Sequence, residues 1–157
     1  MRHVISVLVE NKFGVLSRIA GLFSARGFNI DSLAVGETED PTTSRMTIVV
    51  KGDDKTLEQV KKQLNKLIDV INVRDLTKKG FIDRELLLFK VEVSPPDKAK
   101  IINLLEKNHA RVLHSGASLL TVEFAGAQEH VLKLLEALKG CSVKDMVRTG
   151  RIALAKE

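Results

Sequence analysis

The chain has 157 residues, of which 25 are Lys or Arg, 20 are Asp or Glu, and 44% are hydrophobic, so we expect one ordinary globular domain or two small ones. Its formal charge of +5 is evenly distributed, with 13 basic and 10 acidic groups in residues 1–80 and 12 and 10 in residues 81–157. Because no basic cluster stands out, nucleic-acid binding through phosphate neutralisation is not expected.

The first half of the chain predicts strands and helices in the order βαββαβ. Residues 2–10 show strand-like alternation and are rich in Val, Ile and Leu, which is typical of a largely buried strand. Apolar side chains recur at helical spacing over 16–23, and Gly27 follows them, where a helix end favours a left-handed residue. Two strands are predicted next, at 28–38 and 45–51. A helix at 57–67 follows an N-cap in 52–54, and a last strand lies at 70–76.

The second half repeats this order after a seam at residues 78–80. The first predicted elements are a strand at 85–93 and a helix at 95–105 that two prolines open. A pair of strands at 111–114 and 118–124, a helix at 131–138 and a final strand at 142–147 follow. The chain is therefore expected to be an α+β protein of two ferredoxin-like βαββαβ units with antiparallel sheets, in domains 1–79 and 80–157. A unit of this size buries only about 60% of its unfolded surface, so we expect dimerisation.

The single cysteine and the absence of long apolar stretches indicate where in the cell the protein is expected. A lone Cys141 excludes a disulfide framework and any Cys-rich metal site, and indicates a reducing environment. No uncharged stretch approaches the roughly 18 apolar residues of a membrane span, and the N-terminus leads straight into a predicted strand, unlike a signal peptide. We expect a soluble cytoplasmic protein with no membrane partner.

The turn between the first strand and the first helix is a candidate ligand site. A glycine there, Gly14, allows the backbone to approach a ligand closely. The amides of Gly14, Val15 and Leu16 lie at the predicted helix N-terminus, where unpaired N–H groups and the helix dipole favour a carboxylate. The alternative is that Gly14 is only a turn glycine.

Two asparagines flank this turn and extend the candidate site. Asn11 follows the first strand and Asn29 begins the second, and an amide oxygen can accept hydrogen bonds from an ammonium group without adding charge. Val15, Leu16 and Ile30 could form an apolar wall. The combination suits a neutral α-amino acid with a small branched side chain. The alternative is that Asn29 is only a strand-entry residue.

An acyl-phosphate hydrolase is the sharpest enzymatic alternative. Residues 14–18 have the Gly-Val-x-x-Arg spacing with which such enzymes hold phosphate at a helix N-terminus. The asparagine that would orient water is expected about one strand later, whereas Asn29 comes early and Gly36 occupies the later position. The serines of the first half have no histidine partner other than His3, so no catalytic constellation is predicted.

Two binding functions of the same fold are less well supported. An RNA-recognition module would need aromatic side chains on its central strands, and residues 45–51 contain none. A metal site would need converging ligands, whereas His109, His114 and His130 are scattered. Neither a nucleic-acid partner nor a bound metal is therefore expected.

Several longer runs of the sequence form a recognisable pattern, namely VLVENKFGVLSR at 7–18, GLFSARGFNIDSL at 21–33, DPTTSRMT at 40–47, LEQVKKQLNKL at 57–67, DREL at 83–86 and RTGR at 148–151. These runs resemble the ACT domain, and more narrowly the small regulatory subunit of acetohydroxyacid synthase (acetolactate synthase). The resemblance is strong over residues 1–80 and follows in outline beyond them.

This resemblance implies a non-catalytic subunit that forms a homodimer through its ACT domain and binds a catalytic large subunit. It implies activation of that subunit, feedback inhibition by valine, and a cofactor set (thiamine diphosphate, Mg and FAD) confined to the catalytic partner. The implied effector site combines residues of two chains, namely Asn11, Gly14, Val15 and Leu16 of one and Asn29 and Ile30 of its mate. A sensor of the ACT type that regulates another enzyme is the alternative.

Overall fold

The computed structural model describes residues 1–78 and 80–157, which form two compact units. The first unit consists of Met1–Ile82 together with Arg151–Glu157, and the second of the residues between them, 83–150. The predicted boundary between 79 and 80 lies close to this division, although Lys79 itself is outside the described residues. The structure differs from the prediction at the C-terminus, which belongs to the first unit rather than to the second domain.

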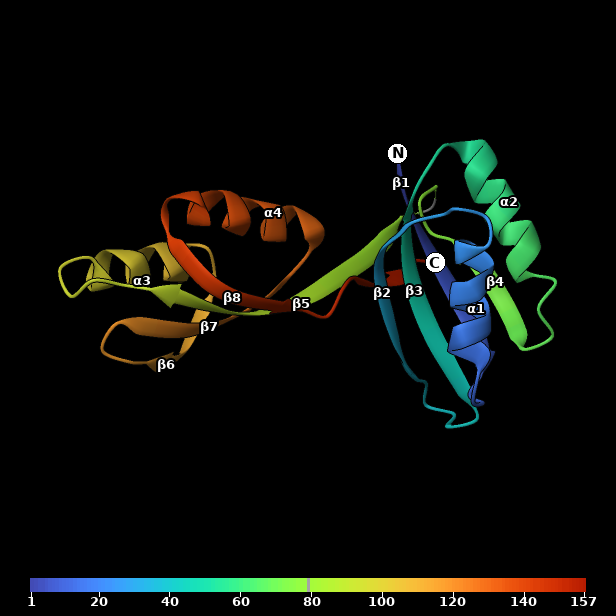
Figure 1. Ribbon diagram of the computed structural model, residues 1–157, viewed down its shortest axis with the longest axis horizontal. Coiled ribbons are helices and arrows are strands. Elements are labelled where there is room, and N and C mark those ends of the chain that lie inside the picture. Colours follow the sequence, from blue (N-terminus) through green and yellow to red (C-terminus); the bar gives the residue numbers. More distant parts are fainter. Residues whose placement is uncertain (79) are drawn as a thin grey trace. The chain divides into compact units, whose positions relative to one another are not determined.

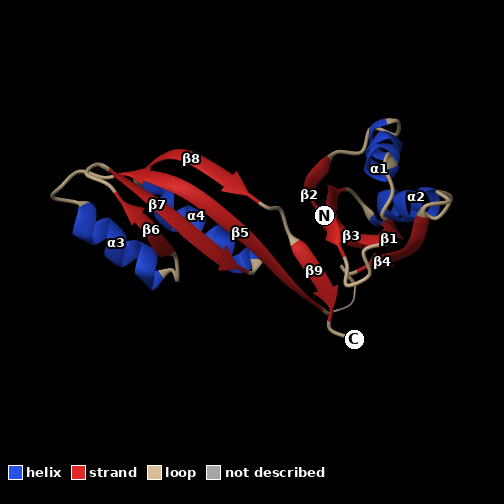
Figure 2. Ribbon diagram, turned by 90° about the horizontal axis from the view of Figure 1, so that it is seen from below, coloured by secondary structure: helices blue, strands red, loops and turns tan. Residues whose placement is uncertain are grey.

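The first unit has the predicted βαββαβ order. Its strands form one antiparallel sheet in the order β2-β3-β1-β4, and its two helices lie on one face of this sheet (Figures 1 and 2). This is the ferredoxin-like arrangement expected from the sequence. The elements are β1 (Arg2–Glu10), α1 (Val15–Ser24), β2 (Ile30–Glu37), β3 (Thr43–Lys51), α2 (Asp54–Leu64) and β4 (Val70–Asp75).

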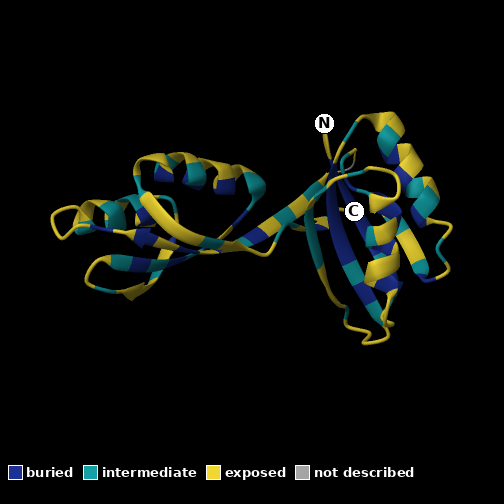
Figure 3. Cartoon of the chain, in the orientation of Figure 1, coloured by how far each residue is buried: buried dark blue, intermediate teal, exposed yellow. Residues whose placement is uncertain are grey.

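The helices of the first unit cover a continuous apolar core. The predicted N-cap of α2 is Asp53, whose carboxylate accepts a hydrogen bond of 2.7 Å from the Thr56 amide. The buried strands β1 and β3 run through the middle of the sheet (Figure 3). The core residues come from these strands and from one stripe of each helix, and include Ile5, Val7, Val9, Val15, Ile19, Phe23, Met46, Ile48, Leu57, Val60 and Leu64.

A short C-terminal strand, β9 (Ile152–Ala155), was not predicted. Ala153 of β9 joins a small apolar cluster with Val4, Val49 and Leu76. The amide of Ala153 donates to the Thr47 hydroxyl at 3.3 Å, and that of Lys156 donates to the Gly80 carbonyl at 2.9 Å. These contacts explain why residues 151–157 belong to the first unit.

The second unit repeats the topology, with an antiparallel sheet in the order β6-β7-β5-β8. Strand β5 (Phe81–Glu92) begins in the first unit and continues into the second. The predicted helix start at Pro95 and Pro96 is a turn, and the helix begins at Lys98. The other elements are α3 (Lys98–Lys107), β6 (Arg111–Ser115), β7 (Leu119–Gly126), α4 (Gln128–Ala137), a 3-10 turn η1 (Leu138–Gly140) and β8 (Ser142–Arg148).

None of the helices within residues 1–78 and 80–157 is long and apolar enough to cross a membrane.

Candidate functional site

The turn between β1 and α1 places Gly14 in a left-handed conformation. Gly14 is the N-cap residue of α1, with φ 79° and ψ −10°. A Cβ atom on this residue would lie 3.0 Å from Nη1 of Arg18. Glycine adopts this backbone region without the steric cost that other residues incur. The left-handed backbone by itself accounts for glycine at this position, and a role of Gly14 in ligand binding stays a prediction.

Two of the three predicted amide donors remain available at the start of α1. The Val15 amide donates to the Lys12 carbonyl at 3.4 Å, so it is already engaged within the turn. The amides of Gly14 and Leu16 donate to no residue in the part of the chain that the structure describes. With the positive end of the helix dipole behind them, these two amides can bind a carboxylate.

The side chains that follow Gly14 have different roles. Val15 is 3% exposed and packs in the core, so it supports the turn and forms no apolar wall. Leu16 is 41% exposed and can contact a ligand at the surface. The apolar part of the candidate site in this chain is thus narrower than the sequence suggested.

The guanidinium group of Arg18 holds the turn in place. Its Nε and Nη2 atoms lie 2.9 Å and 2.7 Å from the same carboxylate oxygen of Asp69, which is almost buried. The Asp69 carbonyl in turn accepts a hydrogen bond of 2.9 Å from the Glu10 amide. Arg18 is therefore already engaged in fastening the start of α1 to the α2–β4 loop, which argues against the phosphate-binding role of the hydrolase alternative.

Asn11 presents an acceptor beside this turn. Its side-chain nitrogen donates to a carboxylate oxygen of Glu37 at 3.1 Å and to the Pro41 carbonyl at 2.9 Å. Because both donors of the amide are used, the Oδ1 atom is left to accept hydrogen bonds, as the ammonium hypothesis requires. Glu37 was not among the predicted site residues, and only the register of β2 against β3 places its carboxylate here.

Charges around the turn are close together and largely paired. The Lys12 ammonium lies 2.6 Å from a carboxylate oxygen of Glu10, and this hydrogen bond raises the pKa of Lys12. Hydrogen bonds from the Thr42 hydroxyl and amide lower the pKa of Asp40 below its ordinary value. The side of the turn near Asn11 therefore carries the negative charge that suits an ammonium group.

Asn29 and Ile30 lie at the opposite end of the same sheet. Ile30 pairs with Val50, which pairs with His3 at the start of β1, whereas Asn11 follows the end of β1. The eight residues from His3 to Asn11 span about 27 Å in an extended strand. One chain therefore brings Asn11, Gly14, Val15 and Leu16 together at the β1–α1 turn and keeps Asn29 and Ile30, at the start of β2, away from them.

Within residues 1–78 and 80–157, no group of three or more His, Cys, Asp or Glu side chains is arranged to hold a metal ion.

Two family models together match most of the chain. Residues 5–72 match the model described as AHAS small subunit-like ACT domain, and residues 84–157 match the one described as small subunit of acetolactate synthase. The second match ends at the C-terminus, so it includes β9.

Proteins and structures similar to this chain carry the same description. The probable acetolactate synthase small subunit of Methanothermobacter thermautotrophicus is 46% identical over 98% of this chain and 92% of that protein. The isozyme 3 small subunit of Salmonella typhimurium is 40% identical, with coverages of 99% and 96%. A crystal structure of the acetolactate synthase small subunit from Thermotoga maritima is 38% identical and superposes with a TM-score of 0.90, covering 100% of this chain and 98% of that one.

Proposed function

The chain belongs to the family of acetolactate synthase small subunits, and we propose that it binds and activates a thiamine-diphosphate-dependent catalytic subunit in the cytoplasm and makes it sensitive to valine. In this proposal the cofactors of the reaction, namely thiamine diphosphate, Mg and FAD, reside in the catalytic partner. The chain itself contributes a binding site for the effector and surfaces for association.

The effector site is built on the β1–α1 turn. The carboxylate of valine accepts hydrogen bonds from the amides of Gly14 and Leu16, and its ammonium group lies near Oδ1 of Asn11 and the carboxylate of Glu37. The Leu16 side chain faces the ligand's methyl groups. The supporting observation is the pair of free amides beside an asparagine whose own donors are already used.

The rest of the site comes from a second copy of the chain. Strand β2 is the outermost strand of its sheet, and no described strand pairs with its outer edge. If β2 pairs antiparallel with β2 of a second copy about a centre between Leu33 and Ala34, Ile30 of the partner subunit lies opposite Glu37. Because Glu37 contacts Asn11, this pairing brings Asn29 of the partner subunit to the β1–α1 turn.

Valine regulates the catalytic subunit by favouring one packing of this dimer. A ligand can shift an equilibrium only by its difference in affinity for the two states. A coupling free energy of about 1–3 kcal/mol changes the balance of states by roughly 5- to 150-fold, which is enough for feedback control.

The proposal is tested by mixing two variants that each lack one half of the site. Gly14→Asp removes the turn half and Asn29→Ala removes the edge half, so neither homodimer should bind valine in isothermal titration. Random exchange of chains gives hybrid dimers with one intact site, which restores about a quarter of the wild-type sites. A mixture that regains no binding contradicts a site shared between two chains.

The regulatory role is tested with a catalytic subunit from a related organism. Adding this chain should raise the rate of acetolactate formation, and valine should reverse that increase. The Asn29→Ala chain should still activate but should no longer respond to valine. Activation by neither chain would favour an amino-acid sensor that regulates another enzyme.

A further inference from the structure

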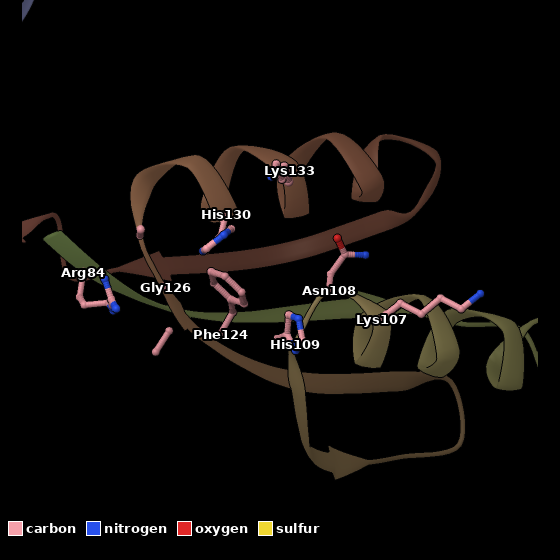
Figure 4. A pocket seen from close by; sticks show the side chains of 10 residues that line it. Arg84, Lys107, Asn108, His109, Phe124, Gly126, His130 and Lys133 are labelled. Carbon is pink, nitrogen blue, oxygen red and sulfur yellow. The ribbon is translucent and has the colours of Figure 1, made fainter. Parts of the chain in front are cut away.

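The second unit contains a cavity of about 530 Å³ that the proposed function does not use. It lies between the C-terminal end of α3, the end of β7 and the first turns of α4 (Figure 4). Ten residues line it, among them three cationic side chains and two imidazoles, and none of the ten is Asp or Glu. The titratable side chains of the lining are therefore all of basic residue types, namely Arg84, Lys107, His109, His130 and Lys133.

In the part of the chain that the structure describes, the lysines of this cavity lack carboxylate partners, unlike several other cations of the same unit. Arg111 is 2.8 Å from Glu123, and Lys144 is 2.7 Å from Glu92. In contrast, Lys107 and Lys133 make no ion pair with any described residue, and Arg84 donates to the backbone carbonyl of Asp83 at 2.6 Å. Unpaired charges of one sign in a concave surface focus the field on anions.

Among residues 1–78 and 80–157, Glu129 is the acidic side chain that pairs with a lining residue, and it is peripheral. A carboxylate oxygen of Glu129 lies 3.6 Å from Nε2 of His130, and the Glu129 side chain is 72% exposed. A solvated carboxylate at this distance does not neutralise the cavity, because its interaction with the imidazole is weak and screened.

His109 is held in a backbone conformation that is unusual for a histidine. It has φ 60° and directly follows Asn108, the C-cap residue of α3. Its amide donates to the Glu106 carbonyl and the Ala110 amide donates to the Leu105 carbonyl, each at 2.9 Å. This hydrogen-bond pattern ends many helices and normally uses glycine at the left-handed position. Because glycine would occupy this position without strain, the histidine motivates the hypothesis that its side chain has a role.

Phe124 and Gly126 adjoin the imidazoles of His109 and His130 in the lining of the cavity. In the view of Figure 4, the rings of His109 and His130 lie on either side of Phe124. A Cβ atom on Gly126 would lie 2.6 Å from Cζ of Phe124 and 3.4 Å from Cβ of His130, so any side chain there would displace them. Lys107 extends along α3 away from the imidazoles in Figure 4 and so contributes only at long range.

We propose that this cavity binds a small multivalent oxyanion, such as a phosphate or diphosphate group, with Arg84, His109 and His130 as its direct donors. A guanidinium group presents paired N–H donors that match two oxygens of a phosphate, and an imidazole adds one N–H donor. Lys107 and Lys133 raise the local concentration of anions without contacting them. The site lies wholly in the second unit and shares no residue with the valine site, so it stands independently of the proposed function.

The experiment is isothermal titration of the full chain with inorganic phosphate and, separately, with pyrophosphate at constant ionic strength. We expect saturable binding, and removal of one charge-assisted donor in Arg84→Gln should weaken it about tenfold or more. Arg111→Gln is the matched control, because it loses the same charge in the same unit and does not line the cavity. Absence of binding by both anions, or equal weakening by the two variants, overturns the proposal.

A second variant separates binding from stability. His109→Gly relieves the left-handed strain, so its melting temperature should be equal to or higher than that of the wild type, whereas its anion affinity should fall. If His109→Gly melts earlier and binds anions normally, His109 serves the end of α3, and the proposed role of its side chain is wrong. Tighter binding of pyrophosphate than of phosphate indicates room for two oxyanion groups.

Discussion

Replacing Gly14 by aspartate tests the proposed valine site at its most constrained residue. The backbone at this position has φ 79°, and a new Cβ would lie 3.0 Å from Nη1 of Arg18, whose guanidinium is fixed by Asp69. A non-glycine residue in the left-handed region costs about 1–2 kcal/mol. Gly14→Asn carries the same cost with an uncharged side chain of nearly the same shape, so it is the matched control.

The charge of the new side chain should decide the binding of valine. Two carboxylates about 4 Å apart repel by about 4 kcal/mol at an effective dielectric constant of 20, and by about 1 kcal/mol in water. Because the turn is exposed, the affinity of Gly14→Asp for valine should be between about fivefold and a thousandfold lower than that of Gly14→Asn.

Urea denaturation and isothermal titration measure the two effects separately. Both variants should lose a similar free energy of unfolding, and only the difference in their valine affinities reports the carboxylate. Equal valine affinities for the two variants would refute the assignment of the ligand carboxylate to the amides of Gly14 and Leu16.

Three further perturbations test the framework of the two units. Arg148→Met leaves the carboxylate of Glu85, whose side chain is 3% exposed, without its two hydrogen bonds, and should cost about 3–5 kcal/mol in urea denaturation; adding Glu85→Gln should recover part of the loss. Asp53→Ala should lower the melting temperature, whereas Asp53→Asn should not. Because the Thr56 amide lowers the pKa of Asp53, this stabilisation is present above the ordinary carboxyl pKa and should disappear as the pH falls through the lowered value. Deleting residues 151–157 should increase hydrogen exchange in β1 and β3, because β9 packs on Val4 and Val49.

The sequence predicted those parts of the fold that have a strong local signal. The spacing of apolar residues located each helix and strand of the two βαββαβ units, and Asp53 was correctly expected in the segment that caps α2. Strand β9 was missed because it has four residues and only Ala153 is buried. The start of α3 was predicted too early, at Pro95 and Pro96 instead of Lys98. Proline fixes its own φ but does not fix where a helix begins.

The candidate site was predictable in part for the same reason. Gly14 could be placed in the turn between β1 and α1 because glycine is typical of a sharp change of chain direction between a strand and a helix. The engagement of the Val15 amide by Lys12 depends on how the turn closes, and the contact between Asn11 and Glu37 depends on strand register. Neither has a local sequence pattern, because both join residues through the fold.

The separation of the two halves of the site bears directly on how such a subunit could regulate a partner. A sheet that holds Gly14 at one end and Asn29 at the other cannot close both halves around one amino acid. If the ligand contacts both, its binding free energy acts on the contact between two chains, because only the paired chains form the complete site. The effector then stabilises one arrangement of the dimer against others, which is the differential affinity that any allosteric ligand requires. A ligand that bound every arrangement of the dimer equally well would shift none of them, however tightly it bound.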